Sequence, residues 1–167
     1  WHGLTGASVL PLQYAGLARL FGDAWRAQPE AIDPDLGAQI ETGLALSEAD
    51  IAAARSASAR MSEILNGFLG TVDALIVPTT PCPAWPVDQL APSLIGGEPC
   101  APRDHAAFTS QCNHAGCPAI TVPFATTEAG LPLGLQIIAA RGRDAELIAT
   151  ARTIMAVLAP KEHERAI

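Results

Sequence analysis

Charged residues are scarce in this chain. Asp, Glu, Lys and Arg make up 16% of its 167 residues, against roughly 25% in an average soluble domain. Apolar residues reach 49%, so we expect other polypeptide to cover much of the surface, with an alanine-rich composition as the alternative explanation. The net charge of −7 and the presence of a single lysine, Lys161, leave no basic stripe for phosphate groups. This argues against a nucleic-acid partner.

Long apolar runs and a recognisable leader are also missing. A membrane span needs about 20 apolar residues, and the longest buried-looking runs, at residues 74–77 and 119–122, have the length of strands. The opening WHGLTG has neither the basic start nor the apolar stretch of a signal peptide. We therefore predict no membrane partner and a cytoplasmic location.

The chain begins with Trp1 instead of methionine, which predicts either processing or a longer parent polypeptide. It has four cysteines, but their spacing is not that of a small disulfide-stapled domain, and the apolar content suffices for a core. We expect free thiols in a reducing compartment.

Helical patterns fill the first 70 residues. Residues 11–28 place their apolar side chains on one stripe. Asp33-Pro34 is typical of a helix start, for a helix that runs to about residue 46. Ser47-Glu-Ala-Asp50 resembles a capping box and predicts a third helix that ends near Gly70.

Strand patterns appear after residue 70. An apolar run at residues 72–78 ends in proline and predicts a buried strand, and residues 119–124 and 133–139 predict two more. Gly130 lies in the link between the last two and is able to adopt a positive φ.

The remaining segments are a long loop and two helices. Residues 79–102 are rich in proline and contain Gly96-Gly97, so we expect no regular structure there. Residues 103–112 are expected to be helical, and Asp144 is expected to cap a last helix through residue 158, before Pro160. This order predicts an α/β fold, although three strands are too few to bury this much apolar helix.

The segment QCNHAGCP, residues 111–118, admits two chemical interpretations. Cys112, His114 and Cys117, with His105 upstream, are the residue types that bind zinc, but the second ligand pair of a structural site is missing. A cysteine–histidine dyad is the other interpretation, supported by the neighbouring Asn113. Adjacency in sequence is poor support for it, because the partners must meet in space.

A turn is the third interpretation of this segment. Asn113 tolerates left-handed conformations and is able to end a helix, and Gly116 accepts a positive φ. Pro118 stops any helical continuation before the strand that follows. The two cysteines then need only be small.

Four pieces of the sequence resemble the amidase signature family. Residues 113–123 (NHAGCPAITVP) and 130–138 (GLPLGLQII), followed by Asp144, match its N-x-x-G-x-P-A-x-x-V-P and G-L-P-x-G-x-Q segments and the Asp before its last helix. Residues 73–81 (DALIVPTTP) resemble its D-x-x-x-x-P-T-x-P segment. Asp33-Pro34 and LSEADI further upstream are similar to its helical linker, so the likeness spans about residues 17–158.

The resemblance implies the C-terminal part of the amidase-signature fold, in the α/β class, with a mixed β-sheet flanked by helices. Residues 1–167 would be the C-terminal portion of a single domain: a helical part at 1–70, a strand, loop, helix and strand part at 71–159, and a polar tail at 160–167. It further implies an amide hydrolase that uses serine chemistry with no metal and no organic cofactor.

The family's Ser–Ser–Lys triad has no counterpart in this chain. Lys161 lies in the polar tail, and Gly6-Ala-Ser8 is the nearest approach to the Gly/Ser-rich loop that carries the nucleophile. Amide hydrolysis through a covalent intermediate requires an activated nucleophile, a proton shuttle and an oxyanion hole. We therefore assign no catalytic residue, and we predict that the isolated chain is inactive.

Three residues are predicted to bind substrate. The resemblance implies that the helix before the N-x-x-G turn lines the acyl side of the pocket, and Arg103, Ala106 and Ser110 share one face of that helix, with residues 79–85 nearby. In glutamine-using amidotransferase subunits of the family, an acidic residue at the position of Ala106 holds the substrate's ammonium. Its replacement here argues against a tRNA-amidotransferase role and favours a neutral or apolar substrate. The alternative is that Arg103 is merely exposed and Ala106 merely packs.

The expected partners are a small-molecule amide, the missing N-terminal part of the enzyme and, as an assembly, a second copy of the chain. The expected function is that of the C-terminal portion of a serine-dependent amidase that hydrolyses a carboxylic amide through an acyl-enzyme. The alternative is a non-catalytic scaffold or interaction domain derived from an amidase.

Overall fold

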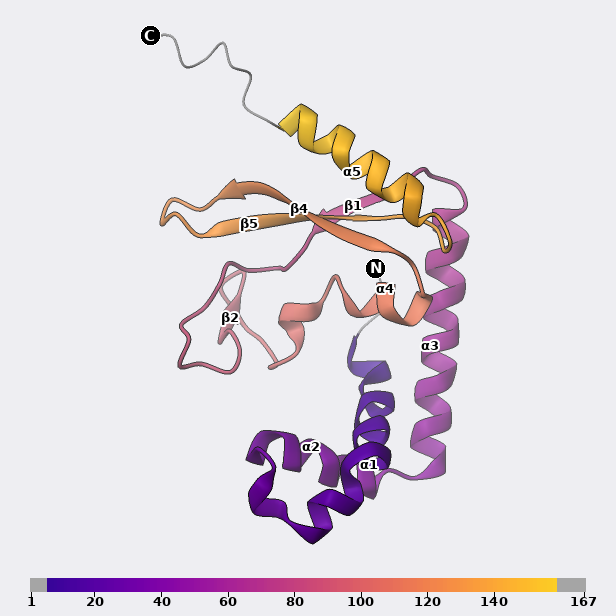
Figure 1. The fold of residues 1–167 in the computed structure, drawn as a ribbon, viewed down its shortest axis with the longest axis vertical. Coiled ribbons are helices and arrows are strands. Elements are labelled where there is room, and N and C mark those ends of the chain that lie inside the picture. The colour runs from indigo at the N-terminus through magenta and orange to yellow at the C-terminus, as the bar shows by residue number, and fades with distance from the viewer. Residues whose placement is uncertain (1–5, 159–167) are drawn as a thin grey trace. The chain divides into compact units, whose positions relative to one another are not determined.

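The computed structural model describes residues 6–158, and the chain divides into two compact units between Met61 and Ser62. Figure 1 shows the elements of both units, which are described separately below. Among the described residues, no helix is long and apolar enough to cross a membrane. Lys161, Pro160 and the predicted polar tail lie outside the described residues.

The first unit is helical, as predicted. It contains the 3-10 turns Gly6–Val9 and Pro29–Ala31, helices α1 (Leu10–Ala27) and α2 (Pro34–Ala45), and the first part of α3 (Glu48–Leu69). These helix bounds lie within two residues of the bounds expected from the sequence.

Local capping fixes where two of these helices begin. The Asp33 carboxylate accepts the backbone N–H groups of Asp35 at 2.9 Å and Leu36 at 3.2 Å, so it caps α2. At the start of α3, the Asp50 carboxylate accepts the Ser47 N–H at 2.9 Å, and the Ser47 hydroxyl oxygen accepts the Asp50 N–H at 3.2 Å. This is the predicted capping box, and the hydrogen bonds from Ser47 lower the pKa of Asp50.

Two glycines of α2 allow α1 to pack closely against it. A Cβ atom on Gly43 would clash with the backbone carbonyl of Tyr14, and one on Gly37 would clash with the ring of Trp25. Any larger residue at either position would therefore force the two helices apart.

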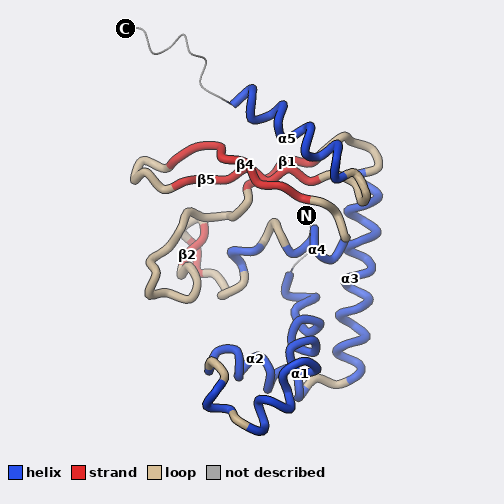
Figure 2. The backbone as a smooth tube through the Cα atoms, in the orientation of Figure 1, coloured by secondary structure: helices blue, strands red, loops and turns tan. Residues whose placement is uncertain are grey.

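The second unit is built on a three-stranded sheet in the order β1-β5-β4, with β1 (Leu75–Pro78), β4 (Ala119–Thr126) and β5 (Pro132–Ile138). Both pairings are antiparallel. The positions of the predicted strands are confirmed, but the expected burial of the first strand was wrong, because β1 alternates between half-buried and exposed residues and Ile76 is 48% exposed. Gly130 adopts φ +79° in the turn between β4 and β5, as expected. Figure 2 shows the sheet, in red, between α5 (Asp144–Leu158) on one face and α4 (Ser110–Ala115) on the other.

The side chains at the end of β5, and of Ala139 directly after it, alternate between two cores. Ile137 and Ala139 point to the face covered by α5, where they pack with Val122, Leu147 and Ala151. Ile138 points to the opposite face, where it packs with the last turns of α3 and with α4, through Leu65, Leu69, Cys112, Ala115 and Cys117.

The structure corrects three further sequence expectations. Residues 79–102 are not wholly irregular, because β2 (Leu94–Ile95) and β3 (Glu98–Pro99) form a small hairpin. Gly96 and Gly97 adopt φ +63° and +86° in its turn, which residues with a Cβ rarely adopt. Asp144 does not cap α5 but is its first residue, where the positive end of the helix dipole still favours a carboxylate.

The third correction concerns residues 103–112, which do not form one helix. Asp104–Ala106 is a 3-10 turn, η3, and α4 begins only at Ser110. We call residues 104–115 the η3–α4 segment.

Candidate functional site

The break in the η3–α4 segment coincides with side chains that bond its carbonyl groups. Ala106 O accepts the Ser110 hydroxyl at 3.0 Å, and Ala107 O accepts the Gln111 amide at 2.8 Å. Phe108 O accepts the side-chain amide of Gln136, on β5, at 2.8 Å. Bonds of this kind compete with the ladder of a regular helix, which gives a physical reason for the interruption.

The predicted substrate-binding residues are therefore arranged differently from the face of a continuous helix. Ala106 and Ser110 stay together, joined by the bond from the Ser110 hydroxyl to Ala106 O. Arg103 lies one 3-10 turn earlier, where its carbonyl accepts the Ala106 N–H at 3.0 Å, and it is exposed. Ala106 and Ser110 are half-buried.

The proline-rich loop reaches the same segment through an aromatic contact. The rings of Trp85 and His105 have centroids 5.1 Å apart and planes inclined at 51°. The Trp85 indole N–H donates to Gln89 O at 2.9 Å, which fixes the ring within its own loop. This contact brings the loop beside Ala106, the residue that follows His105.

A row of polar groups lies on the sheet face that carries Ile138. It consists of Gln136, in register with Thr121 of β4, and of Thr79, which follows β1. The Thr79 and Thr121 hydroxyl oxygens are 3.1 Å apart. They meet across Gly134, where a Cβ atom would lie 2.7 Å from Thr79 Oγ1 and 2.8 Å from Thr121 Cγ2. Glycine is thus required for the two hydroxyls to approach.

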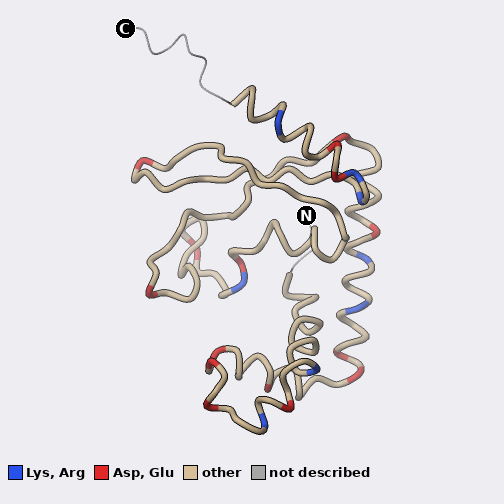
Figure 3. Tube along the Cα trace, in the orientation of Figure 1, with Lys and Arg blue, Asp and Glu red and all other residues tan. Residues whose placement is uncertain are grey.

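Burial differs along this polar row. Gln136 is only 4% exposed, whereas Thr121 is exposed and Thr79 is half-buried. None of the three strands carries a charged residue, as Figure 3 shows. The polar row is therefore an uncharged hydrogen-bonding surface, open at its β4 side and anchored in the core at Gln136.

The turn interpretation of residues 111–118 is confirmed. Gly116 adopts φ +65° at the end of α4, its N–H donates to Asn113 O at 3.3 Å, and the Cys117 N–H donates to Cys112 O at 3.1 Å. This pair of bonds is a Schellman motif, in which the C-terminal carbonyl groups of the helix are satisfied. Asn113 lies within α4 and is not left-handed: across residues 6–158, only glycines have a positive φ.

Cys112 and Cys117 do not form a reactive site. Burial, with a smaller contribution from nearby Cys117, raises the pKa of Cys112 to about 11. Burial also raises the pKa of Cys117 and lowers the pKa of His114. A thiol with such a pKa is almost fully protonated at neutral pH, so it is a poor nucleophile. All four cysteines are free thiols.

Metal binding finds no support in the described part of the chain. Across residues 6–158, no three His, Cys, Asp or Glu side chains are grouped as ligands would be. The Cys117 thiol instead donates to Asn66 Oδ1 at 3.4 Å, and the Asn66 amide donates to Ala115 O at 3.0 Å. These bonds tie the turn after α4 to α3.

Sequence reasoning did not assign a role to Gln136, Thr79 or Thr121. The sequence nevertheless contained signals for two of them. Gln136 is the glutamine of the G-L-P-x-G-x-Q segment, and Thr79 is the threonine of the D-x-x-x-x-P-T-x-P segment and begins the loop expected near the pocket. Thr121 gave no comparable signal, because its contact with Thr79 depends on strand register and on Gly134 between them.

Comparison with known proteins identifies relatives of this chain. The family model described as Amidase matches residues 18–148. The Acylamidase of Rhodococcus erythropolis is 32% identical over 136 residues, which are 80% of this chain and 28% of that protein. A Glutamyl-tRNA(Gln) amidotransferase subunit of Pseudothermotoga lettingae is 37% identical over 92 residues, which are 55% of this chain and 18% of that protein.

A solved structure shares the fold over nearly the whole chain. It is a crystal structure of an amidase, which superposes with a TM-score of 0.85 at 29% sequence identity. The match covers 93% of this chain and 36% of that one, so the chain spans little more than a third of the length of that amidase. The α/β fold is that of the amidase structures, and since the family model matches residues 18–148, the chain belongs to the Amidase family.

Proposed function

We propose that this chain is the C-terminal portion of a serine-dependent amidase, one part of a single domain, that hydrolyses a carboxylic amide through an acyl-enzyme. The observation that carries the proposal is the family match over residues 18–148, in a chain that covers only 36% of the similar amidase structure. The chain completes the fold and lines the substrate pocket, while residues outside it supply the nucleophile.

The proposed reaction divides between the two parts of the protein. A serine oxygen attacks the carbonyl carbon of the amide, the C–N bond breaks, and the amine leaves with a proton. Water then cleaves the acyl-serine ester and releases the carboxylic acid. The described residues near the proposed pocket contribute binding and orientation of the substrate, because the hydroxyls of Ser110, Thr79 and Thr80 contact backbone carbonyls or another hydroxyl and not a general base.

The pocket wall that we assign to this chain is made of Arg103, Ala106 and Ser110. Two observations support it: Ala106 and Ser110 are half-buried and hydrogen-bonded together, and the Trp85 ring contacts His105, the residue before Ala106. Ala106 offers a methyl group and no charge. The proposed substrate is therefore a neutral amide with an apolar acyl group, and not an amino acid amide that needs a carboxylate to hold its ammonium.

An Ala106→Asp substitution in the full-length protein tests the pocket. We expect KM for a neutral anilide such as 4-nitroacetanilide to rise about tenfold, since a half-buried carboxylate would lose part of its hydration when an apolar group binds against it. Ala53→Asp, at an exposed position of α3, is the matched control and is expected to leave KM unchanged. Equal KM values for A106D and the unsubstituted protein would show that Ala106 does not line the pocket.

The proposal that residues outside this chain supply the nucleophile is tested separately. The 167-residue chain alone is expected to show no amide hydrolysis, whereas the full-length protein is expected to hydrolyse the anilide. Turnover by the isolated chain that disappears when one of its serines or cysteines is replaced would overturn the proposal. Intact mass and N-terminal sequencing of the natively produced protein test the scaffold alternative. A polypeptide that begins near Trp1 and has no co-purifying chain would favour it.

A further inference from the structure

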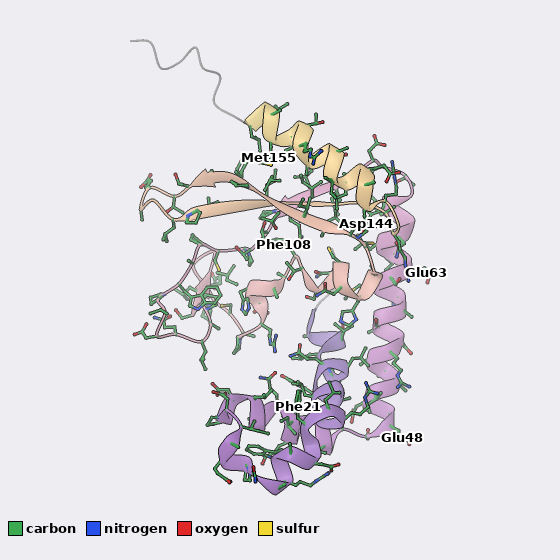
Figure 4. All side chains as sticks on the ribbon, viewed as in Figure 1. Phe21, Glu48, Glu63, Phe108, Asp144 and Met155 are labelled. Carbon is green, nitrogen blue, oxygen red and sulfur yellow. The ribbon has the colours of Figure 1, made fainter. Side chains whose placement is uncertain are left out.

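Gln136 forms a polar bridge between the sheet and the η3–α4 segment. It lies on β5, the central strand, with Val77 and Thr121 as its neighbours in register. Its side chain is 4% exposed, and its amide Nε2 donates to Phe108 O at 2.8 Å across 28 residues of sequence. Figure 4, which labels Phe108, shows this segment running beneath the sheet.

Apolar packing alone does not explain a buried amide at this position. The same sheet face buries Ile138 with Leu65 and Leu69, and an aliphatic residue at 136 would pack there without needing a partner. A buried amide without a hydrogen bond is strongly unfavourable, so Gln136 is stable only when the carbonyl of Phe108 stays in place. The glutamine therefore fixes the position of the Phe108 carbonyl, which an apolar side chain would not do.

The carbonyl that Gln136 binds lies midway along the proposed pocket wall. Phe108 is two residues after Ala106 and two before Ser110, in the interval between η3 and α4. One residue separates Phe108 from Ala106 and one separates it from Ser110, and consecutive Cα atoms stay about 3.8 Å apart. A shift of Phe108 therefore displaces Ala106 and Ser110 as well. Across residues 6–158, only Gln111 and Gln136 are buried polar side chains, and the bond of Gln111 to Ala107 O stays within its own segment.

We propose that Gln136 is a positioning residue for substrate binding, which fixes Ala106 and Ser110 at the pocket through its hydrogen bond to Phe108. This inference rests on the proposed function, because it assumes that the η3–α4 segment lines the pocket. Gln136 itself does not touch the substrate. It sets the affinity for substrate and leaves the chemical step unchanged.

The test compares Gln136→Met with the unsubstituted full-length protein. Methionine has nearly the same volume but donates no hydrogen bond. We expect amide hydrogen exchange to become at least tenfold faster at residues 106–111 and to stay unchanged in β5. In hydrolysis of 4-nitroacetanilide, we expect KM to rise about tenfold with kcat unchanged, because displacement of a wall weakens binding without altering the reacting groups.

Two further variants test whether the loss of the hydrogen bond causes these effects. Gln136→Leu is a second uncharged variant of similar size that cannot donate to Phe108, so its exchange and KM are expected to change in the same direction as in Q136M. Thr153→Val removes the bond of Thr153 to Ala149 O, at 3.1 Å within the exposed side of α5, and is expected to change neither quantity.

The outcomes separate the failure of this inference from that of the proposed function. Unchanged exchange at residues 106–111 in both Gln136 variants, or faster exchange spread equally over β5, would overturn the positioning role. Faster local exchange with an unchanged KM would overturn the assignment of the segment to the pocket, and the inference would fall with it. Absence of anilide hydrolysis by the unsubstituted protein, together with failure to bind the anilide, would overturn both.

Discussion

The two faces of the three-stranded sheet are built for different tasks. On the α5 face, the buried side chains are aliphatic throughout: Val122, Ile137, Ala139, Leu147 and Ala151. On the opposite face, Ile138 and two thiols share the core with the amide of Gln136, and the Thr79–Thr121 contact continues the polar row. The first face supplies stability by burial, whereas the second gives up apolar packing for hydrogen bonds in fixed positions.

This difference supports the location that we propose for the site in the second unit. Apolar contacts are not directional, so a face made only of them tolerates small shifts of α5. A hydrogen bond holds only near one distance and one angle, so the polar row specifies the position of what it binds. The η3–α4 segment, which carries the proposed substrate-binding residues, is held on that second face by Gln136.

The largest effect is expected from Ile137→Ala on the α5 face. Ile137 is fully buried, and its truncation removes apolar contacts and leaves a cavity. We expect the free energy of unfolding to fall by about 2–5 kcal/mol, measured by urea denaturation. KM for the anilide is expected to stay constant, and a rise in KM as large as that of A106D would erase the distinction between the faces.

Gly134→Ala is expected to have the next largest effect, on the polar face. The added Cβ would lie 2.7 Å from Thr79 Oγ1 and 2.8 Å from Thr121 Cγ2, so the two threonines must separate. We expect a loss of about 1–3 kcal/mol in urea denaturation together with a rise in KM. A stability loss without any change in KM would indicate that the polar row has no part in binding.

Thr121→Val isolates the hydrogen bond of the same row. Valine has almost the shape of threonine, and the contact to Thr79 at 3.1 Å is solvent-exposed. A single exposed hydrogen bond contributes about 0.5–1 kcal/mol, so we expect a small decrease in stability. Thr153→Val on α5 serves as the comparison, and equal losses in the two variants would show that the row adds nothing beyond ordinary contacts.

The smallest effect on stability is expected from thiol modification at neutral pH. Because the pKa of Cys112 is about 11, its thiolate fraction at pH 8 is about one in a thousand and rises about tenfold per pH unit. Iodoacetamide is expected to modify the half-buried Cys82 and Cys100 first, with no change in the unfolding midpoint. Rapid labelling of Cys112 in the folded protein, located by peptide mass analysis, would contradict its burial.

The elements that could be predicted from the sequence are those whose cause is local. Asp33-Pro34, the Ser47–Asp50 pair and Gly116 each end or begin a helix through atoms within five residues, and each acts as predicted. The strand positions also followed from the apolar pattern. The resemblance of residues 73–81, 113–123 and 130–138 to the amidase signature family was sufficient to name the family from the sequence.

The arrangement of the candidate site could not be predicted in this way. Residues 103–112 have a sequence compatible with a continuous helix, and the interruption involves a bond between Phe108 and Gln136, two residues far apart in the chain. The approach of Thr79 to Thr121 likewise requires two strands to pair on either side of Gly134.

The sequence by itself determined the helix boundaries, the strand positions and the family, because these follow from side chains acting on their own backbone or from motifs read in order. Tertiary structure alone decided which face of the sheet is polar and where Ala106 and Ser110 lie. The physical reason is that a buried amide must find its partner, and for Gln136 that partner becomes available only when the sheet has formed and the η3–α4 segment has packed against it.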